Sequence, residues 1–349
     1  MLEPRAAVRK MAPYSPPSAG REGKLRLDFN ENTVGSSPAV VEFLREHLTA
    51  SQLSIYPEYA DAMRELAAFF AVGEDEFTLT NGTDEAIQVL INTFINDGDD
   101  VIVLKPSYAM YRFYAELAGA SIREVEYRAG TLAFPMDELL GSITPATRAV
   151  LIANPNNPTG TAIDLDGIKK IIDAAPHAAV LVDEAYFEFS EITALPWIRD
   201  YSNLFVSRTF SKVYGMAGMR CGCLFSGPRN VAWMKKTQSP YSVNSMAALA
   251  ARAAIRDRAY VERYVDEVLA ARALGYEGLH KLGIKTFPSE ANFILFELGD
   301  RAVPIRDAMR ERGVLVRDRS YEIPGCVRVT IGTRVQIERF LEELRKLWT

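Results

Sequence analysis

The residues with the clearest capacity for chemistry lie around Lys212. Residues 207–212 read Ser-Arg-Thr-Phe-Ser-Lys, follow a short apolar run, and precede glycines and Arg220. A lysine amine in this setting suits a Schiff base with a carbonyl group. The hydroxyls of Thr209 and Ser211 could bind a phosphate whose charge Arg220 would neutralise. The alternative is a surface lysine in a flexible loop.

A second candidate is Asp183, which directly follows the apolar run 179–182. A carboxylate at the end of a buried strand is unfavourable unless a cation pairs with it, and a protonated pyridine nitrogen is such a cation. The pairing would keep the ring cationic, so that the ring acts as an electron sink. Tyr186, three residues later, could reach a phenolate oxygen on the same ring. The alternative for Asp183 is a helix N-cap.

Two proline-containing segments add polar or aromatic groups after strand-like runs. Residues 154–160 read Asn-Pro-Asn-Asn-Pro-Thr-Gly, a rigid turn that would place Asn157 as a donor to the phenolate oxygen. Tyr108 follows Lys-Pro-Ser and could stack on an aromatic ring. The alternatives are an ordinary tight turn and a packing tyrosine.

Residues 80–86 form a turn of small residues that is expected to open a helix. Free N–H groups and the helix dipole make such a start a phosphate site, and Gly82 and Thr83 would supply these groups. A capped helix start with Thr83 as N-cap is the alternative. Arg328, inside the apolar run 327–331, requires an anionic partner. That partner could be a substrate carboxylate, a substrate phosphate or an internal acid.

The segments that must position these residues are expected to alternate between strands and helices. Short apolar runs, mostly β-branched and bounded by polar, Gly or Pro residues, are typical of buried parallel strands. The runs are 101–104, 149–152, 179–182 and 204–206. Helical spacing predicts helices over 58–70, 84–94 and 165–174. The pattern indicates an α/β fold with helices on both faces of a largely parallel sheet.

The composition changes after about residue 245. Residues 246–282 are expected to be one long helix rich in Ala and Arg, followed by a smaller α+β region. That region has strand-like runs and a final helix, at 293–297, 313–317, 327–331 and 335–347. Residues 1–24, rich in Pro, Gly and Arg, are expected to form an extended arm. The predicted division is an arm and part of the small domain at 1–45, a large domain at 46–245 and a C-terminal small domain at 246–349.

Composition excludes several classes of function. The 349 residues carry a formal charge of −5 with no block of Lys and Arg, so nothing favours nucleic-acid binding. No apolar run approaches about 18 residues, and no signal peptide is expected. Cys221, Cys223 and Cys326 favour a reducing cytoplasm over a disulfide framework, and they suggest no metal site. A nicotinamide dehydrogenase would need Gly-x-Gly-x-x-Gly after its first strand, which is missing in that context.

Taken together, these motifs resemble the fold-type I aminotransferases that depend on pyridoxal-5′-phosphate (PLP). The order Asn157, Asp183, Tyr186, Lys212, Arg220 reproduces that family's order and rough spacing. Tyr lies three residues after Asp, and Arg lies eight after Lys. The resemblance covers nearly the whole chain. It implies a large domain with a mostly parallel seven-stranded sheet flanked by helices, and a smaller α+β domain.

The resemblance also implies roles for individual residues. Lys212 would carry PLP as a Schiff base and later move protons, and Lys212, Asp183 and Tyr186 would be the catalytic residues. Asp183 would hold the pyridinium, Asn157 and Tyr186 the ring oxygen, and Tyr108 would stack on the ring. The cofactor phosphate would be bound by Gly82, Thr83, Thr209, Ser211 and Arg220, with Asp84 also at the cofactor.

Within that family, the sequence is most similar to the histidinol-phosphate aminotransferases. The supporting segments are 27–32, 56–58, 81–85, 183–189, 208–212, 219–222 and 239–244. This resemblance implies L-histidinol phosphate and 2-oxoglutarate as substrates in a ping-pong cycle. Arg328 would grip the donor's carboxylate or phosphate, with Asn157, Asn32 and Tyr241 also at the substrate. Tyr56 would reach the phosphate in the neighbouring subunit, which implies a homodimer.

Other members of the family stay open as alternatives. Aromatic amino-acid aminotransferases, and less closely threonine-phosphate decarboxylases, share almost all of the cofactor motifs. A PLP-sensing regulator would carry an N-terminal DNA-binding domain, and only about 25 residues precede the first family-like segment. One departure concerns the substrate entrance. Family members usually read Asn-Glu-Asn-Pro-Tyr-Gly where residues 30–35 read Asn-Glu-Asn-Thr-Val-Gly.

Overall fold

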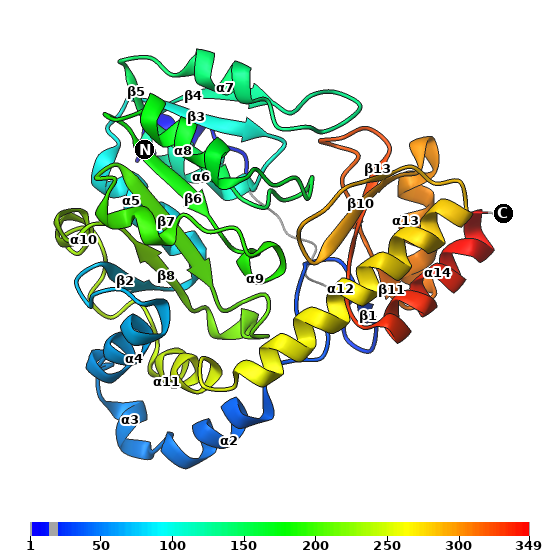
Figure 1. Cartoon of the computed structure of the whole chain (residues 1–349), viewed down its shortest axis with the longest axis horizontal. Helices are drawn as coiled ribbons and strands as arrows, with labels where there is room; N and C mark the ends of the chain where they lie inside the picture. The colour runs from blue at the N-terminus through cyan, green and yellow to red at the C-terminus, as the bar shows by residue number, and fades with distance from the viewer. Residues whose placement is uncertain (1, 14–19, 349) are drawn as a thin grey trace.

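The computed structural model describes residues 2–13 and 20–348, and its largest element is a seven-stranded sheet (Figure 1). In spatial order the strands are β2 (Phe77–Thr80), β8 (Gly222–Phe225), β7 (Leu204–Thr209), β6 (Ala179–Asp183), β5 (Thr147–Ala153), β3 (Asp100–Lys105) and β4 (Ser121–Glu126). Only β8 runs antiparallel to its neighbours, and the remaining pairs are parallel. The expectation of a mostly parallel sheet is confirmed.

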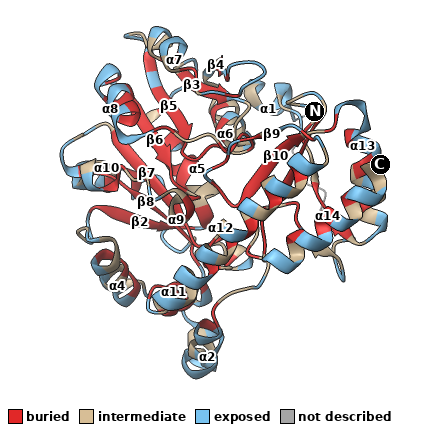
Figure 2. Cartoon of the chain, turned by 45° about the vertical axis from the view of Figure 1, so that its right-hand side comes forward, coloured by how far each residue is buried: buried red, intermediate tan, exposed pale blue. Residues whose placement is uncertain are grey.

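Both faces of this sheet are covered, because successive strand residues alternate between two apolar clusters. Leu151 and Leu181 pack toward α5 (Gly82–Phe94), α6 (Ala109–Ala118) and α10 (Pro228–Met234). Ile152 and Val182 pack toward the opposite cluster. That cluster includes residues of α4 (Ala60–Phe70), α7 (Met136–Ser142), α8 (Leu165–Ala174) and α11 (Ser245–Ala254). Apart from the edge strand β4, the strands are accordingly mostly buried in Figure 2, as expected for a sheet between helical layers.

A second, smaller unit contains two short sheets. The antiparallel sheet has the order β12 (Arg317–Asp318), β13 (Cys326–Thr330), β10 (Phe293–Glu297) and β9 (Thr286–Phe287). The other pairs β1 (Leu25–Arg26) in parallel with β11 (Val314–Leu315). The helices around them are α12 (Arg258–Lys281), α13 (Ala302–Glu311) and α14 (Arg334–Trp348). The segment at residues 25–26 is therefore built into the unit formed by the end of the chain.

Three local expectations were wrong. The stretch 246–282 is two helices, because Asp257 accepts a hydrogen bond from the Tyr260 amide and caps a new helix, α12. The run 313–317 is two strands, because β11 and β12 pair in different sheets. The arm contains the helix α1 (Ala6–Lys10), since Ala, Arg and Lys favour helix and Arg5 bonds the Leu117 carbonyl at 3.1 Å. Residues 14–19 of the arm lie outside the described residues.

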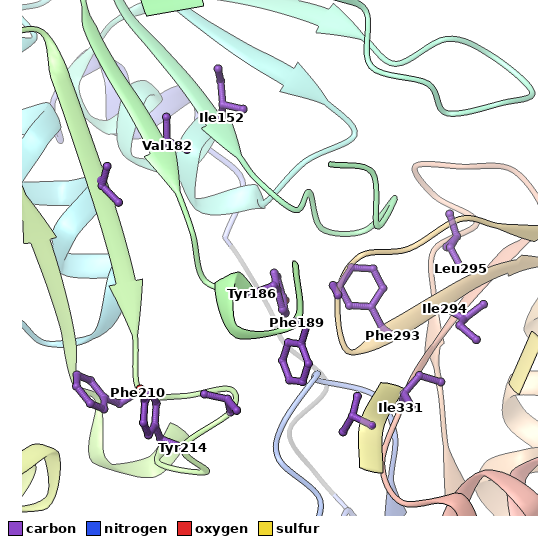
Figure 3. Packing of buried hydrophobic residues seen from close by; sticks show 14 of the residues in the cluster. Ile152, Val182, Tyr186, Phe189, Phe210, Tyr214, Phe293, Ile294, Leu295 and Ile331 are labelled. Carbon is purple, nitrogen blue, oxygen red and sulfur yellow. The ribbon is translucent and has the colours of Figure 1, made fainter. Parts of the chain in front are cut away.

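The remaining short elements are α2 (Pro38–His47), α3 (Ala50–Ser54), α9 (Phe187–Ser190), η1 (Leu195–Arg199), η2 (Ala217–Met219) and η3 (Gly299–Arg301). The large and small units meet at α9, where the ring of Tyr186 lies 5.4 Å from that of Phe293 at a steep angle (Figure 3). The Gly160 carbonyl also accepts a hydrogen bond from the Glu290 amide. The boundaries of the two domains, at about residues 45 and 245, stay a prediction. None of the described helices is long and apolar enough to span a membrane.

Candidate active site

A cavity of about 400 Å³ lies where the carboxyl ends of β5, β6 and β7 meet the loops that follow them. Open α/β sheets bind ligands at this edge. Ten of the residues singled out from the sequence line the cavity. They are Thr83, Asp84, Tyr108, Asn157, Asp183, Tyr186, Thr209, Ser211, Lys212 and Arg220. The structure thus brings together segments that are up to 137 residues apart, from Thr83 to Arg220.

Asp183 is buried at the floor of this cavity, with 4 % of its surface exposed. Its carboxylate accepts hydrogen bonds from the hydroxyls of Tyr111, at 2.7 Å, and Ser207, at 2.9 Å. Burial raises the pKa of Asp183 to about 6, although these two hydrogen bonds lower it. Asp183 does not cap a helix, because α9 begins only at Phe187. A buried acid with this pKa is suited to receive a cationic partner.

The opposite end of the cavity gathers donors at the start of α5. Gly82 has a positive φ of 74°, and a side chain there would come within 2.4 Å of the Arg220 guanidinium. Arg220 also has a left-handed φ, of 55°. Thr83 is not the N-cap, since α5 begins at Gly82 and its N-cap residue is Asn81. Only glycine at position 82 lets the arginine approach the helix start, where an anion would also bind.

Asp84 orients two of the neighbouring side chains. Its carboxylate accepts a hydrogen bond from the Tyr108 hydroxyl at 2.6 Å and one from Arg220 at 3.1 Å. Tyr108 caps α6 and packs edge-on against Tyr111, 5.7 Å away, one helical turn further on. Helix α6 therefore positions both Tyr108, an aromatic wall of the cavity, and Tyr111, the hydrogen-bond donor to the buried Asp183.

Lys212 follows β7 and projects toward the N-terminal segment. Its amine donates to the Phe29 carbonyl at 3.3 Å and lies 5.7 Å from the centre of the Tyr186 ring. The Tyr186 hydroxyl accepts a hydrogen bond from Asn30 at 2.9 Å, which leaves its own proton available for donation. The amine and the phenol therefore face the same cavity from two different elements.

Arg328 is buried on β13, and no acidic residue among those described forms an ion pair with it. Its guanidinium donates to the amide oxygen of Asn157 and to the Asp28 carbonyl at 2.8 Å, while its Nε has no partner. Burial, with nearby Arg319 and Arg317, lowers the pKa of Arg328 to about 10. The alternative of an internal salt bridge is therefore wrong.

Three residues expected at the site lie elsewhere in this single chain. Tyr56 and Tyr241 are mostly exposed and stack on each other at 4.4 Å, outside the cavity. Asn32 is buried, donates to the Val213 carbonyl and accepts from two backbone amides at positions 34 and 35. Its side chain holds the backbone turn at residues 33–34, where the sequence departs from the family pattern, and its expected contact with the substrate stays a prediction.

Sequence reasoning missed several residues that the structure places at the cavity. Arg21, Phe29 and Glu31 line its mouth, and Arg21 donates to Glu31 and to Asp28 at 2.7 and 2.8 Å. The Arg21 guanidinium also lies 4.4 Å from the Phe29 ring. Tyr111 carried one usable signal, because it lies three residues after Tyr108 on a helix. No sequence signal pointed to Arg21, since its partners lie in an irregular segment without helical or strand periodicity.

Four features of this residue set fit PLP. Asp183 is a buried carboxylate that a pyridinium would pair with, and Tyr108 offers an aromatic wall. Gly82 leaves room at a helix start beside Arg220, Thr209 and Ser211, which suits a phosphate group. Lys212 supplies the amine that a carbonyl group would need.

Comparison with known proteins agrees with this geometry. Residues 22–344 match the model of the family described as aminotransferase class I and II. The histidinol-phosphate aminotransferase of Symbiobacterium thermophilum is 37 % identical, covering 99 % of this chain and 98 % of its own. The structure of the enzyme of that name from Clostridium acetobutylicum superimposes with a TM-score of 0.85 at 25 % identity, covering 92 % of this chain and 98 % of its own.

A further solved structure shares the fold. It is the histidinol-phosphate aminotransferase of Sinorhizobium meliloti in complex with PLP, at 22 % identity and a TM-score of 0.89, covering 98 % of this chain and 97 % of its own. The family match spans both the strand-end cavity and the Arg328 strand. This chain therefore belongs to the class I and II aminotransferase family.

Proposed function

We propose that this aminotransferase uses PLP to transfer the amino group of L-histidinol phosphate to 2-oxoglutarate. The relatives named above support the donor, and the cavity supports the cofactor. The three cysteines are free and buried, which supports a cytoplasmic enzyme.

The observation that carries the choice of donor is the arginine group around β13. Arg328 is buried without an acidic partner, and the charges of Arg319 and Arg317 both act on it to lower its pKa. Like charges at close quarters are unfavourable unless anions lie among them, and the single acid Glu322, which pairs with Arg319, offsets only one of the three arginine charges. A phosphate dianion compensates more positive charge than one carboxylate does, and guanidinium groups bind phosphate well. A donor that carries a phosphate therefore suits this site better than an ordinary amino acid.

The same residues indicate how the reaction proceeds. Lys212 would hold PLP, Asp183 its ring nitrogen, Tyr186 and Asn157 its ring oxygen, and Arg220 with the start of α5 its phosphate. When bound, PLP supplies an electron sink for the carbanion at the donor's α-carbon. The Lys212 amine takes the α-proton, and general base help of this kind contributes roughly 10² to 10⁴ in rate. Asn157, held by Arg328, links cofactor binding to donor binding.

A homodimer is part of the proposal. Tyr56 and Tyr241 are large and exposed, and Leu53, Ile55 and Met246 near them in sequence are exposed as well. Contiguous exposed apolar side chains mark interaction surfaces. We infer that a second copy covers them and that Tyr56 reaches the cofactor phosphate of the neighbouring subunit.

Replacing Lys212 tests the cofactor assignment. Lys212→Ala should lose transamination completely, because both the attachment point and the proton carrier are gone. Borohydride treatment of the PLP-loaded wild type, followed by mass spectrometry, should find the reduced adduct on the peptide that contains Lys212. Exposed Lys235→Ala serves as the control and should keep both properties. Turnover near the wild-type rate in Lys212→Ala would refute the assignment.

Replacing Asp183 should have opposite effects on the activity of the PLP-loaded protein and on the stability of the PLP-free protein. Asp183→Asn should lose most of its activity, since the cationic ring loses its partner. Because the folded carboxyl has a raised pKa, the PLP-free wild type should lose stability as the pH rises from about 4 to 6. A rise from 3.8 to about 6 corresponds to roughly 3 kcal/mol. PLP-free Asp183→Asn should therefore unfold at higher denaturant concentration at pH 8 and converge with the wild type at pH 4. Full activity, or no gain in stability, would contradict the role of Asp183.

Replacing Arg328 tests the donor. Arg328→Gln should lower kcat/KM for L-histidinol phosphate by about 10- to 150-fold, since a hydrogen bond to a charged group contributes about 1.5–3 kcal/mol. L-phenylalanine is the comparison donor, and the exposed Arg312→Gln is the matched control. A wild-type preference for L-phenylalanine would instead make the protein an aromatic amino-acid aminotransferase. Release of carbon dioxide from L-threonine phosphate would favour a decarboxylase.

Mixing two inactive variants tests the dimer. Lys212→Ala and Tyr56→Ala subunits, denatured together and refolded, should regain up to about a quarter of wild-type activity. Half of the dimers are then mixed, and each has one site with both Lys212 and the partner subunit's Tyr56. Each variant refolded alone is the control. No recovered activity would show that Tyr56 does not act across an interface.

A further inference from the structure

A second cavity, of about 500 Å³, lies behind the floor of the candidate active site. Strand residues alternate between the two faces of the sheet, so neighbouring positions serve different cavities. Asp183 and Thr209 line the active-site cavity, whereas Arg208 lines the second one and binds Glu184. Adjacent residues at the end of β7 therefore line different cavities.

The walls of the second cavity are mostly apolar and come from four parts of the chain. They are formed by Phe69, Phe70, Phe187, Leu195, Ile255 and Val261. Its size lies within the range of small-molecule sites, which is about 300–1,000 Å³. Such a space, with aromatic and aliphatic walls, favours a compact ligand with an apolar body.

The arginine at the floor of this cavity is already neutralised. Arg208 donates to Glu184 at 2.7 Å and to the Thr193 hydroxyl at 2.9 Å, and its guanidinium lies 3.5 Å from the centre of the Phe187 ring. Glu184 also accepts from the Ala194 amide at 2.7 Å. The Arg208–Glu184 pair is therefore satisfied internally and does not demand an anion from outside.

Glu188 differs, because its carboxylate lines the cavity with no ion-pair partner among the described residues. Burial raises the pKa of Glu188 to about 7, even though the Arg208 charge lowers it. The other charged groups at this cavity are Arg199, which pairs with Glu76, and Arg258 and Glu262 at its exposed edge. The Tyr214 hydroxyl also faces the cavity and is held neutral, since burial raises its pKa.

We propose that this second cavity is a binding site for a small organic cation with an apolar or aromatic body. An amidinium, imidazolium or ammonium group would donate to the Glu188 carboxylate, and the body would fill the space between Phe69, Phe70 and Phe187. The cation compensates Glu188, which has no ion-pair partner among the described residues and, unlike Glu262, is not exposed to solvent. The site is separate from that of the proposed amino donor, since the two cavities have no lining residue in common and neither Lys212 nor Arg328 lines the second one.

Calorimetric titration of the PLP-loaded protein with benzamidine tests the proposal. Benzamidine carries an aromatic ring and an amidinium but no primary amine that could compete with Lys212. At pH 8, above the pKa of Glu188, the wild type should bind benzamidine at least about tenfold more tightly than Glu188→Gln does. Neutral benzamide should bind both proteins weakly and equally.

Filling the cavity provides a second variant that leaves the carboxylate in place. Val261→Trp should abolish benzamidine binding while transamination continues, which excludes binding at the active site. The proposal is overturned by equal affinity of wild type and Glu188→Gln, by benzamide binding as tightly as benzamidine, or by unchanged binding in Val261→Trp. Tight binding of benzoate in place of benzamidine would also overturn it and would make the cavity an anion site.

Discussion

A carboxyl group buried at the end of a central strand constrains the rest of the large unit. Asp183 is almost fully enclosed, so its charge must be met by hydrogen bonds and by a cation. Tyr111 and Ser207 supply the hydrogen bonds, which fixes the position of α6 against the sheet and the register of β7 beside β6. In the proposed function, the cation would be the pyridinium ring of the cofactor. Without such a cation, the charged form of this carboxyl group is unfavourable, so the group suited to the cofactor is also a cost to the cofactor-free fold.

Side chains alternate between the two faces of the sheet along β6 and β7, so adjacent residues at each strand end contact different surroundings. Asp183 and Glu184 are adjacent in sequence, yet one meets the proposed cofactor and the other forms an ion pair with Arg208. Burial raises the pKa of both carboxyl groups, and both accept hydrogen bonds: Asp183 from α6 and β7, and Glu184 from the segment at 193–194 and from Arg208. A shift of the backbone at this strand end would therefore displace the side chains on both faces of the sheet. Tyr186 directly precedes α9, which carries Phe187 and Glu188, so the phenol of one cavity and the wall of the other lie within three consecutive residues.

The sequence allowed the large sheet and most of the candidate site to be predicted, because each strand end and its polar residues are local signals. Asn157, Asp183 and Lys212 all follow short apolar runs. The other residues of the site are brought together by contacts between segments far apart in the sequence, and local sequence patterns do not predict such contacts. Tyr111 meets Asp183 across 72 residues, and Asn30 meets Tyr186 across 156. Asn32 was assigned to the substrate by resemblance, whereas in this chain its amide holds a turn that has no proline to stiffen it.

The pairing of β1 with β11 has a consequence for biosynthesis. The Asn30 amide bonds the Thr330 hydroxyl, 300 residues away, and Leu27 bonds Leu315 through the backbone. At about 5–20 residues per second, a ribosome needs roughly 15 to 60 s to deliver those partners after the first strand has emerged. All seven strands of the large sheet are complete by Phe225, so that sheet can form during the wait. Meanwhile Leu25, Leu27 and Phe29 remain without their final neighbours, which makes this short N-terminal segment a natural contact for chaperones on the nascent chain.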